Sequence, residues 1–503
     1  MGESVLEPGI AVVRPVLRAG VPLCVDLDGT LVKSDTLVDT VLAMARQKPM
    51  DLWRIPGWIA QGKASFKKHL TAAVTLDVEH LPYNHALLEW LRQEAGAGRE
   101  IYQATAADMT LAERVAAFVG IFKGVLASDG STNLAGGNKL AAFQARFGDE
   151  FCYIGNALPD APLLAACVSP MVANPDRALR AAMKRQGTVP VTVFEHKTPV
   201  IKSWLRAIRL HQWAKNTLIF VPLLLAHAWN PGTLMGAALA FLSFGMCASA
   251  TYIINDLLDI EADRRHPRKR TRPFAAGDIS PIAGVMGVVV LMLAAVALAI
   301  ALPQIVDNMA GFGELEKPYG FLGWLGLYTV TTLAYSLYLK RQLLLDVFVL
   351  SGLYTVRLLA GSAATGVMMS PWLDGFSVFF FLSLAFVKRF SELESLRERG
   401  AAVSNGRGYF VSDLEQLRAL GTGAAYAAVV VLTLYINNPE TIMLYRHVTR
   451  LWLVVPVLLL WLSQVWMLSS RGELHDDPVV FAITDKRSLL LGVLMAAVVW
   501  WAL

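Results

Sequence analysis

The chain has 503 residues, of which 55% are hydrophobic and 17% are charged, whereas about a quarter of the residues of a soluble domain are charged. This length and composition exclude a single soluble domain. The formal net charge of +5 does not indicate a nucleic-acid-binding protein, because the basic residues cluster in short loops between apolar segments. Residues 1–200 are typical of a soluble α/β protein, and residues 201–503 of a polytopic membrane protein.

An apolar segment at residues 21–27 is the first predicted strand, and it runs into the sequence DLDGT. Asp26 and Asp28 therefore lie at the carboxyl end of this strand. Two carboxylates in this position suit a nucleophile and an acid/base partner around Mg²⁺. Gly29 allows the tight turn that follows the strand.

Further polar groups follow this motif in chain order. They are Thr105 at the end of a second predicted strand, Lys139 after two glycines, and the pair Asn156 and Asp160 after a third strand. Together these motifs resemble the haloacid dehalogenase superfamily over residues 20–185. The resemblance implies an α/β, Rossmann-like phosphatase domain at 1–190 with a helical cap at about 36–95.

The resemblance also implies roles for these residues. Asp26 would be the phosphoryl-accepting nucleophile and Asp28 the general acid/base, and Thr105 and Lys139 would contact the phosphoryl group. The expected Mg²⁺ ligands are Asp26, Asp28, Asn156 and Asp160. Asn156 stands where the family usually has an aspartate, and an amide is a weaker Mg²⁺ ligand than a carboxylate. A degenerate scaffold domain without phosphatase activity is therefore the alternative interpretation.

After a linker at 191–200, the domain at 201–503 is expected to be an all-α membrane domain. A membrane-spanning helix needs roughly 20 mostly apolar residues. The pattern predicts nine such helices, at 205–229, 234–259, 281–303, 320–340, 343–367, 372–392, 419–437, 449–469 and 485–503.

The distribution of charge in the loops predicts the orientation of these helices. Basic residues lie in or beside the loops 260–280, 340–343 and 392–418, whereas the loop 304–319 carries Asp307, Glu314 and Glu316. We expect the basic loops and the loop 470–486 on the cytoplasmic side. The first 20 residues lack the pattern of a signal peptide. We therefore expect a multi-pass protein of the inner (cytoplasmic) membrane, with the N-terminal domain and the active sites in the cytoplasm and the C-terminus outside.

The strongest motif of the membrane domain follows the second predicted span. Its acidic and amide side chains lie on one face of a helix: Asn255, Asp256, Asp259 and Asp263. Oxygen ligands spaced this way suit Mg²⁺ that is shared with substrate phosphates. Pro267 should end the helix. The basic residues around it can then fold back onto an anionic substrate: His266, Lys269, Arg270 and Arg272. The alternative is that the acids only balance the charge of the basic loop.

Other polar residues recur at the same predicted side of the membrane. They are Lys215, Asn216, Tyr335, Lys340, Asp346, Arg357, Lys388 and Arg389. Arg357 lies within an apolar span, where an unpaired cation costs at least ~2.5 kcal/mol. Its expected partner is a substrate phosphate or an acid of another span. Lys388 and Arg389 could instead reach along their helix to the membrane surface.

The pattern NDxxDxxxD resembles the UbiA-type superfamily of intramembrane prenyltransferases, over residues 200–503. The strings IRLHQWAKN, HPRKRTRP and VKRFSEL resemble its decaprenyl-phosphate phosphoribosyltransferase branch. The resemblance implies that Asn255, Asp256, Asp259 and Asp263 bind Mg²⁺ and the diphosphate, with Asp256 and Asp259 as catalytic groups. Asp346 would lie near the second acidic site, which has one acid instead of the two of the aromatic enzymes.

This branch implies transfer of 5-phosphoribose from phosphoribosyl diphosphate to polyprenyl (decaprenyl) phosphate, with at least one Mg²⁺ in each domain. The fused phosphatase indicates a second step, removal of the 5-phosphate. The product would be polyprenyl-phosphoryl-ribose, a precursor of arabinofuranose donors for cell-wall arabinan. The expected partners are these two substrates and the membrane, with no nucleic acid, and a homo-oligomer is left open.

Two alternatives from other classes remain. One is an aromatic-acceptor prenyltransferase that uses a polyprenyl diphosphate and carries a phosphatase of other or no activity. The other is a membrane-anchored scaffold or transporter with an inactive phosphatase, although a transporter site would be expected in broken helices at the middle of the bilayer.

Overall fold

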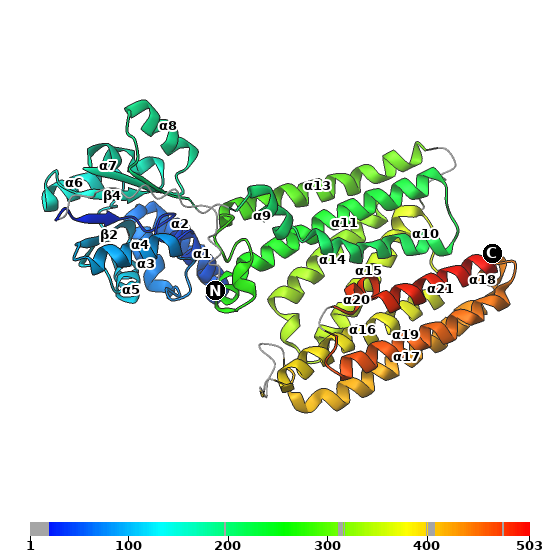
Figure 1. Cartoon of the computed structure of the whole chain (residues 1–503). Helices are drawn as coiled ribbons and strands as arrows, with labels where there is room; N and C mark the ends of the chain where they lie inside the picture. Colours follow the sequence, from blue (N-terminus) through cyan, green and yellow to red (C-terminus); the bar gives the residue numbers. More distant parts are fainter. Residues whose placement is uncertain are drawn as a thin grey trace, which may run out of the picture. The chain divides into compact units, whose positions relative to one another are not determined.

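The chain forms two compact units. The first comprises residues 1–208 and 252–287, and the second comprises residues 209–251 and 288–503. The computed structural model, drawn in Figure 1, describes residues 20–195, 198–309, 315, 317–398, 400, 408–474 and 477–503. Glu314 and Glu316 of the predicted acidic loop lie outside the described residues.

A six-stranded parallel sheet in the order β3-β2-β1-β4-β5-β6 forms the centre of the first unit. Its strands are β1 (Leu23–Val25), β2 (Ile101–Asp108), β3 (Gly124–Ser128), β4 (Cys152–Gly155), β5 (Ser169–Ala173) and β6 (Thr192–Phe194). The strand order reverses between β1 and β4, and open parallel sheets bind ligands outside the carboxyl ends of the strands at such a point. Asp26 and Asn156 directly follow these two strands, so the predicted α/β fold is confirmed and the motif lies at the switch point.

Helices cover both faces of this sheet. They are α1 (Thr36–Gln47), α2 (Ile55–Ala60), α3 (Lys63–Ala73), α4 (His85–Gly96), α5 (Met109–Val119), α6 (Gly137–Phe147), α7 (Ala161–Ala166) and α8 (Arg177–Gln186), with the short 3-10 helices η1 (Pro49–Arg54) and η2 (Leu158–Asp160). Successive residues of β1 enter two different cores. Leu23 and Val25 pack in a core with residues of α4 and α5, and Cys24 packs in a core with residues of α6, α7 and α8. A parallel strand buried on both faces is therefore apolar at every position.

Two features of the first unit concern the predicted boundaries. β6 pairs in parallel with β5, so Thr192–Phe194, which fall in the predicted linker, belong to the sheet. The unit also contains α9 (Val200–Ala207), α12 (Ile260–Arg265) and η4 (Lys269–Thr271). As the sequence predicts, the helix that carries the last acidic residue ends just before Pro267.

The second unit is a bundle of helices (Figure 1). It contains η3 (Leu210–Phe220), α10 (Val221–Leu225), α14 (Gly320–Leu337), η5 (Leu339–Arg341), α15 (Leu345–Thr365), α16 (Pro371–Glu398), η6 (Val411–Asp413), α17 (Leu414–Ile436), α18 (Pro439–Leu444), η7 (Val448–Leu453), α19 (Val454–Ser470), α20 (Pro478–Thr484) and α21 (Lys486–Ala502). The long helices α11 (Pro231–Leu258) and α13 (Pro281–Asp307) contribute residues to both units. α15 is central, because it packs against α14, α16 and η3.

Five helices of the described chain are long and apolar enough to cross a membrane, by length and composition. They are Pro231–Leu258, Pro281–Asp307, Leu345–Thr365, Val411–Ile436 and Val448–Ser470. The predicted number of nine is therefore not reached. Among the other predicted spans, α21 has 17 residues, and the end of the 28-residue α16 carries charged side chains such as Lys388 and Arg389.

The first predicted span, 205–229, is wrong as a continuous helix. It is divided into α9, η3 and α10, and Arg209 between the first two has a left-handed backbone with φ 50°. η3 also packs closely on α15. A Cβ at Gly361 would lie 2.1 Å from the carbonyl oxygen of Ile219, so the η3 backbone rests directly on that glycine. The apolar composition of the segment continues across Arg209 and cannot reveal this break.

Candidate functional site

Lys139 is the central cation of a polar cleft in the first unit. Its Nζ lies 2.9 Å from Oδ1 of Asp26 and 3.0 Å from the hydroxyl of Tyr153. The Tyr153 hydroxyl donates to Oδ1 of Asp160 at 2.7 Å, and that oxygen lies 3.7 Å from Nζ. All four side chains are buried. One ammonium group thus faces two carboxylates that follow neighbouring strands of the sheet.

Asp28 and Asn156 complete this cleft. Oδ1 of Asp28 accepts the backbone N–H of Thr36 at 2.7 Å, which joins the turn after β1 to the start of α1. Gly29 has φ 74°, and a Cβ there would lie 2.0 Å from Nδ2 of Asn156. Only glycine therefore allows the amide to approach this turn. Oδ2 of Asp160 accepts the backbone N–H groups of Asn156 and Ala157, at 3.0 and 3.1 Å.

Burial raises the pKa values of the two aspartates of the DLDGT motif. Burial raises the pKa of Asp26, and the charge of Lys139 offsets only part of this effect. Burial also raises the pKa of Asp28, and the neighbouring charge of Asp35 raises it further. A carboxyl group with a raised pKa can donate a proton near neutral pH, which suits the expected general acid Asp28.

Thr105 is placed differently from the other predicted residues. Its side chain is fully buried, and its Oγ1 accepts the backbone N–H of Ala107 at 3.0 Å. The neighbouring Ala106 lines the cleft and accepts a hydrogen bond from Nζ of Lys67 in α3 at 2.5 Å. Lys67 and Tyr153 also contact residues of the cleft, although the sequence motifs do not include them.

The cleft has a volume of about 360 Å³, and a segment distant in the sequence contributes to its lining. The lining includes Asp26, Asp28, Lys139, Asn156 and Asp160, and also Gly277, Ile279, Ser280 and Pro281. The second group follows the acidic motif of the predicted membrane domain and belongs to the same compact unit. The cleft therefore combines residues from both ends of the first unit's sequence.

Arg272 lies between two buried carboxylates of the acidic motif. Its Nη1 is 3.1 Å from Oδ1 of Asp256 and 2.7 Å from Oδ2 of Asp263. The chain continues in helical geometry from α11 to α12, because the N–H groups of Asp259 and Asp263 donate to carbonyl oxygens four residues earlier. Asp256 and Asp263 consequently converge on one cationic group.

This carboxylate set has the chemistry of a divalent-cation site, although the side chains do not form one as they stand. Among the described residues, no three His, Cys, Asp or Glu side chains gather closely enough to hold a metal ion. Two buried carboxylates that already share one positive group nevertheless offer the hard oxygen ligands that Mg²⁺ prefers. In the basic segment, Nδ1 of His266 accepts the backbone N–H of Arg268, and the side chains of Lys269 and Arg270 are exposed.

Asp259 of this motif and the neighbouring Arg264 contact the α/β fold of the same unit. Oδ1 of Asp259 lies 3.2 Å from Nη2 of Arg46 in α1. Nη1 of Arg264 lies 2.9 Å from Oδ2 of Asp39, and both side chains are buried. Ser34, which lines the cleft, donates to the same oxygen of Asp39 at 2.6 Å. A buried ion pair therefore connects the acidic motif to a residue of the cleft wall.

In the second unit, Arg357 is buried beside neutral groups. Its Nε donates to Oδ1 of Asn216 at 2.9 Å, and its other nitrogens contact the Tyr328 hydroxyl and the carbonyl oxygen of Leu353. Its guanidinium also faces aromatic rings, the nearest being that of Tyr328 at 4.9 Å. Among the described residues, no carboxylate pairs with Arg357, so the expected acid from another span is not found.

Lys215 and Lys388 meet at a residue that the sequence analysis missed. The Nζ atoms of both lysines lie 2.9 Å from Oδ2 of Asp477. Oδ1 of Asp477 accepts from the Tyr354 hydroxyl at 3.0 Å. Asp477 precedes the proline that begins α20, and this sequence pattern predicts a helix cap. The pattern does not predict the contacts of Asp477 with the two lysines.

Asp346 is the partner of Arg389. Both side chains are buried, and Nε of Arg389 donates to Oδ2 of Asp346. The hydroxyl of Tyr409 donates to the other oxygen, and Tyr335 accepts from Nη2 of Arg389 at 2.9 Å. Lys340 is half-buried in the neighbouring η5. Arg389 therefore does not extend along its helix to the membrane surface. Its charge is neutralised inside the bundle by Asp346.

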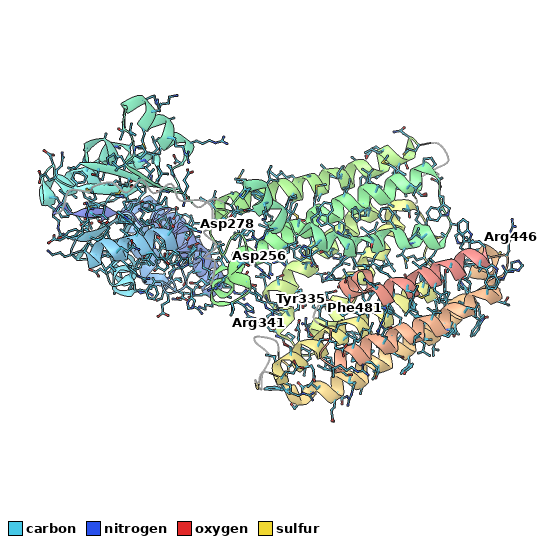
Figure 2. All side chains as sticks on the ribbon, viewed as in Figure 1. Asp256, Asp278, Tyr335, Arg341, Arg446 and Phe481 are labelled. Atoms are coloured by element: carbon cyan, nitrogen blue, oxygen red, sulfur yellow. The ribbon has the colours of Figure 1, made fainter. Side chains whose placement is uncertain are left out.

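The clusters around Asp477 and Arg389 lie near one end of the second unit. Figure 2 shows Tyr335, Arg341 and Phe481 at the same end of the bundle and Arg446 at the other. Asp477 begins the helix α20 that carries Phe481, and Arg389 contacts Tyr335. Seven of the substrate-binding residues predicted for the membrane spans thus form local clusters around Arg357, Asp477 and Arg389: Lys215, Asn216, Tyr335, Asp346, Arg357, Lys388 and Arg389.

The sequence is similar to those of several known proteins. A protein of Sinorhizobium fredii with the name uncharacterized protein y4nM is 36% identical over 479 residues, which are 95% of this chain and 90% of that protein. The decaprenyl-phosphate phosphoribosyltransferase of Mycobacterium tuberculosis is 32% identical over 231 residues, which are 45% of this chain and 71% of that protein.

The chain also resembles a solved structure and matches a protein family. A UbiA homolog from Archaeoglobus fulgidus bound to GPP and Mg²⁺ is 15% identical, with a TM-score of 0.44, and covers 60% of this chain and 99% of that one. Residues 217–484, more than half of the chain, match the UbiA prenyltransferase family. The chain therefore belongs to the UbiA prenyltransferase family.

Proposed function

We propose that this UbiA-family protein is a bifunctional membrane enzyme that builds a lipid-linked ribose. Its membrane part would transfer 5-phosphoribose from phosphoribosyl diphosphate to a polyprenyl phosphate, and its α/β domain would remove the 5-phosphate. The observation that carries the proposal is the convergence of Asp256 and Asp263 on Arg272 within a basic segment. This segment combines ligands for a cation with donors for phosphate oxygens. The 32% identity to a decaprenyl-phosphate phosphoribosyltransferase supports the same substrate pair.

The acidic motif would bind Mg²⁺ through Asp256 and Asp263, with Asn255 and Asp259 as further ligands. The metal would neutralise part of the charge of the departing diphosphate. Arg272 and the exposed Lys269 and Arg270 would hold diphosphate oxygens by charge-assisted hydrogen bonds, and His266 would lie beside them.

The transfer itself needs little proton movement. The bond between C1 of the ribose and the diphosphate oxygen breaks, and diphosphate leaves with the electron pair. An oxygen of the polyprenyl phosphate, already an anion, forms the new bond to C1. The chain's contribution is to stabilise the leaving group and to align the two phosphates. In the second unit, the buried Lys215 and Arg357 and the half-buried Lys388 would bind phosphate oxygens.

The α/β cleft supplies the groups for the second step. Asp26 would attack the 5-phosphate to form an aspartyl phosphate, and Asp28 would give its proton to the ribose oxygen that leaves. Water would then attack the phosphorus as Asp28 takes its proton back, which releases inorganic phosphate. Lys139, 2.9 Å from Asp26, would hold the nucleophile and a phosphoryl oxygen. Asp26, Asp28 and Asn156 would hold Mg²⁺ there. The expected fourth ligand, Asp160, already accepts hydrogen bonds from protein donors at both of its oxygens.

The proposed product is polyprenyl-phosphoryl-ribose, which would serve as a precursor of arabinofuranose donors. The chain would work in the cytoplasmic membrane, with the α/β domain and the acidic motif on the cytoplasmic side. The basic loops beside the predicted spans support this orientation.

The test follows radiolabel from phosphoribosyl diphosphate into lipid, with purified protein, a polyprenyl phosphate and Mg²⁺. The wild-type protein should label the lipid, and Asp256→Asn should reduce the rate by about 100-fold or more, because it removes a buried charge from the cation site. Asp307→Asn, at the exposed end of α13, is the matched control and should keep the wild-type rate.

The second step is read from the phosphate content of the labelled lipid. Wild-type protein should yield ribose without the 5-phosphate, and Asp26→Asn should leave the 5-phosphate in place. A wild-type protein that labels no lipid under these conditions would contradict phosphoribosyl transfer and would favour prenylation of an aromatic acceptor.

A further inference from the structure

One carboxylate in the second unit faces two ammonium groups. The Nζ atoms of Lys215 in η3 and Lys388 in α16 both lie 2.9 Å from Oδ2 of Asp477. We refer to Lys215 and Lys388 as the lysine pair. Asp477 is 262 positions from Lys215 and 89 from Lys388, so the fold creates this contact. A single negative charge leaves the three groups with a net positive charge.

The helix-capping role of Asp477 does not explain its contact with the lysine pair. Asp477 precedes α20, and its Oδ1 accepts the backbone N–H of Val479 at 3.2 Å. A cap needs one oxygen, and asparagine caps a helix about as well as aspartate. The second oxygen and the negative charge are therefore available for the lysines.

A donor beside the lysine pair lacks an acceptor. Nδ2 of Asn216 is buried and has no hydrogen-bond partner in the described part of the chain. Asn216 follows Lys215 directly, and its Oδ1 is bonded to Arg357. The Tyr354 ring links these groups, because Nζ of Lys215 and the guanidinium of Arg357 each lie 5.7 Å from its centroid.

These groups match an anion with several oxygens. A buried donor without an acceptor is costly, and a buried guanidinium whose contacts are neutral oxygens retains its full charge. A phosphate or diphosphate group would supply both the acceptor for Asn216 and the charge for Arg357. Lys215 lies beside the same Tyr354 ring as Arg357, so the lysine pair offers this anion further donors, and the carboxylate of Asp477 opposes it.

We propose that Asp477 is an internal anion that competes with a phosphate group of the substrates for the lysine pair. This inference rests on the proposed function, which gives both substrates such a group. By offering the lysines an alternative partner, Asp477 weakens phosphate binding and speeds the departure of a phosphate-bearing product. Two like charges at one pair of ammonium groups repel each other, so the carboxylate and the phosphate cannot both be held at full strength.

The experiment removes the charge of residue 477 and keeps its role as the cap of α20. In the full chain, Asp477→Asn removes the negative charge and retains a capping side chain. The KM values for phosphoribosyl diphosphate and for the polyprenyl phosphate are measured separately, together with inhibition by inorganic diphosphate. We expect one KM to fall by about tenfold or more, since a repulsive contact is removed. The substrate whose KM falls is the one whose phosphate binds at the lysine pair.

Two variants serve as controls. Asp477→Glu keeps the negative charge and should retain KM values close to those of the wild type. Asp485→Asn changes another capping aspartate, whose side chain accepts the N–H of Ser488 at 2.8 Å at the start of α21. It should leave both KM values unchanged, since it has no contact with the lysine pair among the described hydrogen bonds.

The outcomes separate this inference from the proposed function. If wild-type protein transfers ribose to lipid and Asp477→Asn folds normally but has unchanged or higher KM values, the inference is wrong. If the wild type transfers no ribose, the proposed function is wrong, and thermal stabilisation by inorganic diphosphate still tests the inference. Asp477→Asn should then be stabilised at about a tenth of the diphosphate concentration that the wild type needs, and equal concentrations would contradict it.

Discussion

A single ammonium group sets the charge balance of the α/β cleft. Lys139 contacts Asp26 directly and lies 3.7 Å from Asp160, and all three side chains are buried. Without Lys139, two buried carboxylates would face each other with no cation in contact, which favours a shared proton over two negative charges. The nucleophile of the proposed phosphatase therefore depends on this one residue for its ionised form.

The first prediction concerns Lys139→Ala. Hydrolysis of a small phosphate monoester by the full chain should fall by about 100-fold or more, because the developing phosphoryl charge loses a positioned cation. Transfer of label to lipid should be unchanged, so the two assays separate a local effect from misfolding. Lys123→Ala is the control, because Lys123 is exposed and pairs with the exposed Glu100. A Lys139→Ala protein that hydrolyses the ester within about threefold of the wild type would remove Lys139 from the mechanism.

At the scale of elements, η3 packs closely on α15 because Gly361 of α15 has no side chain. A Cβ at Gly361 would lie 2.1 Å from the carbonyl oxygen and 2.8 Å from the carbonyl carbon of Ile219. Both atoms belong to the backbone, so no side-chain rotation can relieve the overlap. Because η3 also carries Lys215 and Asn216, this packing positions groups of the candidate phosphate site.

The second prediction follows from this contact. Gly361→Ala should destabilise the bundle by about 1–3 kcal/mol through overpacking and lower the rate of lipid labelling. Gly352→Ala is the matched control on the same helix, because a Cβ there meets no heavy atom within 4 Å. It should be neutral or stabilise by up to about 1 kcal/mol through helix propensity. Thermal unfolding of both variants in the same detergent tests this, and equal unfolding temperatures would contradict it.

The elements that local pattern determines were predictable from the sequence. The apolar strand before Asp26 and the helix that ends before Pro267 depend on neighbouring residues, and both are present. The helical continuity of the acidic motif follows for the same reason. The contact of η3 with Gly361 was not predictable, because it joins residues far apart in the sequence.

The same distinction applies to single residues of the candidate site. The four-residue spacing from Asp259 to Asp263 is visible in the sequence, whereas Asp477 gains its significance from lysines in two other elements. Asp39 is similar, since its buried partner Arg264 is 225 positions away. Contacts of this kind leave no spacing signal in one sequence, so only the fold reveals them.

At the scale of the whole molecule, the first unit joins the acidic motif of the UbiA-family part to the α/β fold. Arg264 follows the last aspartate of the motif and forms a buried ion pair with Asp39 in α1. Asp39 in turn accepts from Ser34 in the cleft wall at 2.6 Å. The same cleft is also lined by Gly277, Ile279, Ser280 and Pro281. The proposed phosphatase is therefore expected to depend on residues outside the α/β fold.

The last prediction tests this dependence with Arg264→Met. The substitution leaves Asp39 buried without its cationic partner, which should cost about 3–5 kcal/mol and loosen the wall that carries Ser34. Hydrolysis of a small phosphate monoester should fall, although no residue of the α/β fold has changed. Adding Asp39→Asn should recover part of the lost stability, because the unpaired charge is removed. Arg265→Met is the control, since Arg265 is largely exposed and its ion pair with Asp77 should contribute under about 1 kcal/mol. If Arg264→Met and Arg265→Met hydrolyse the ester equally well, the cleft does not depend on the acidic motif, and the two proposed activities share a chain without sharing a structural unit.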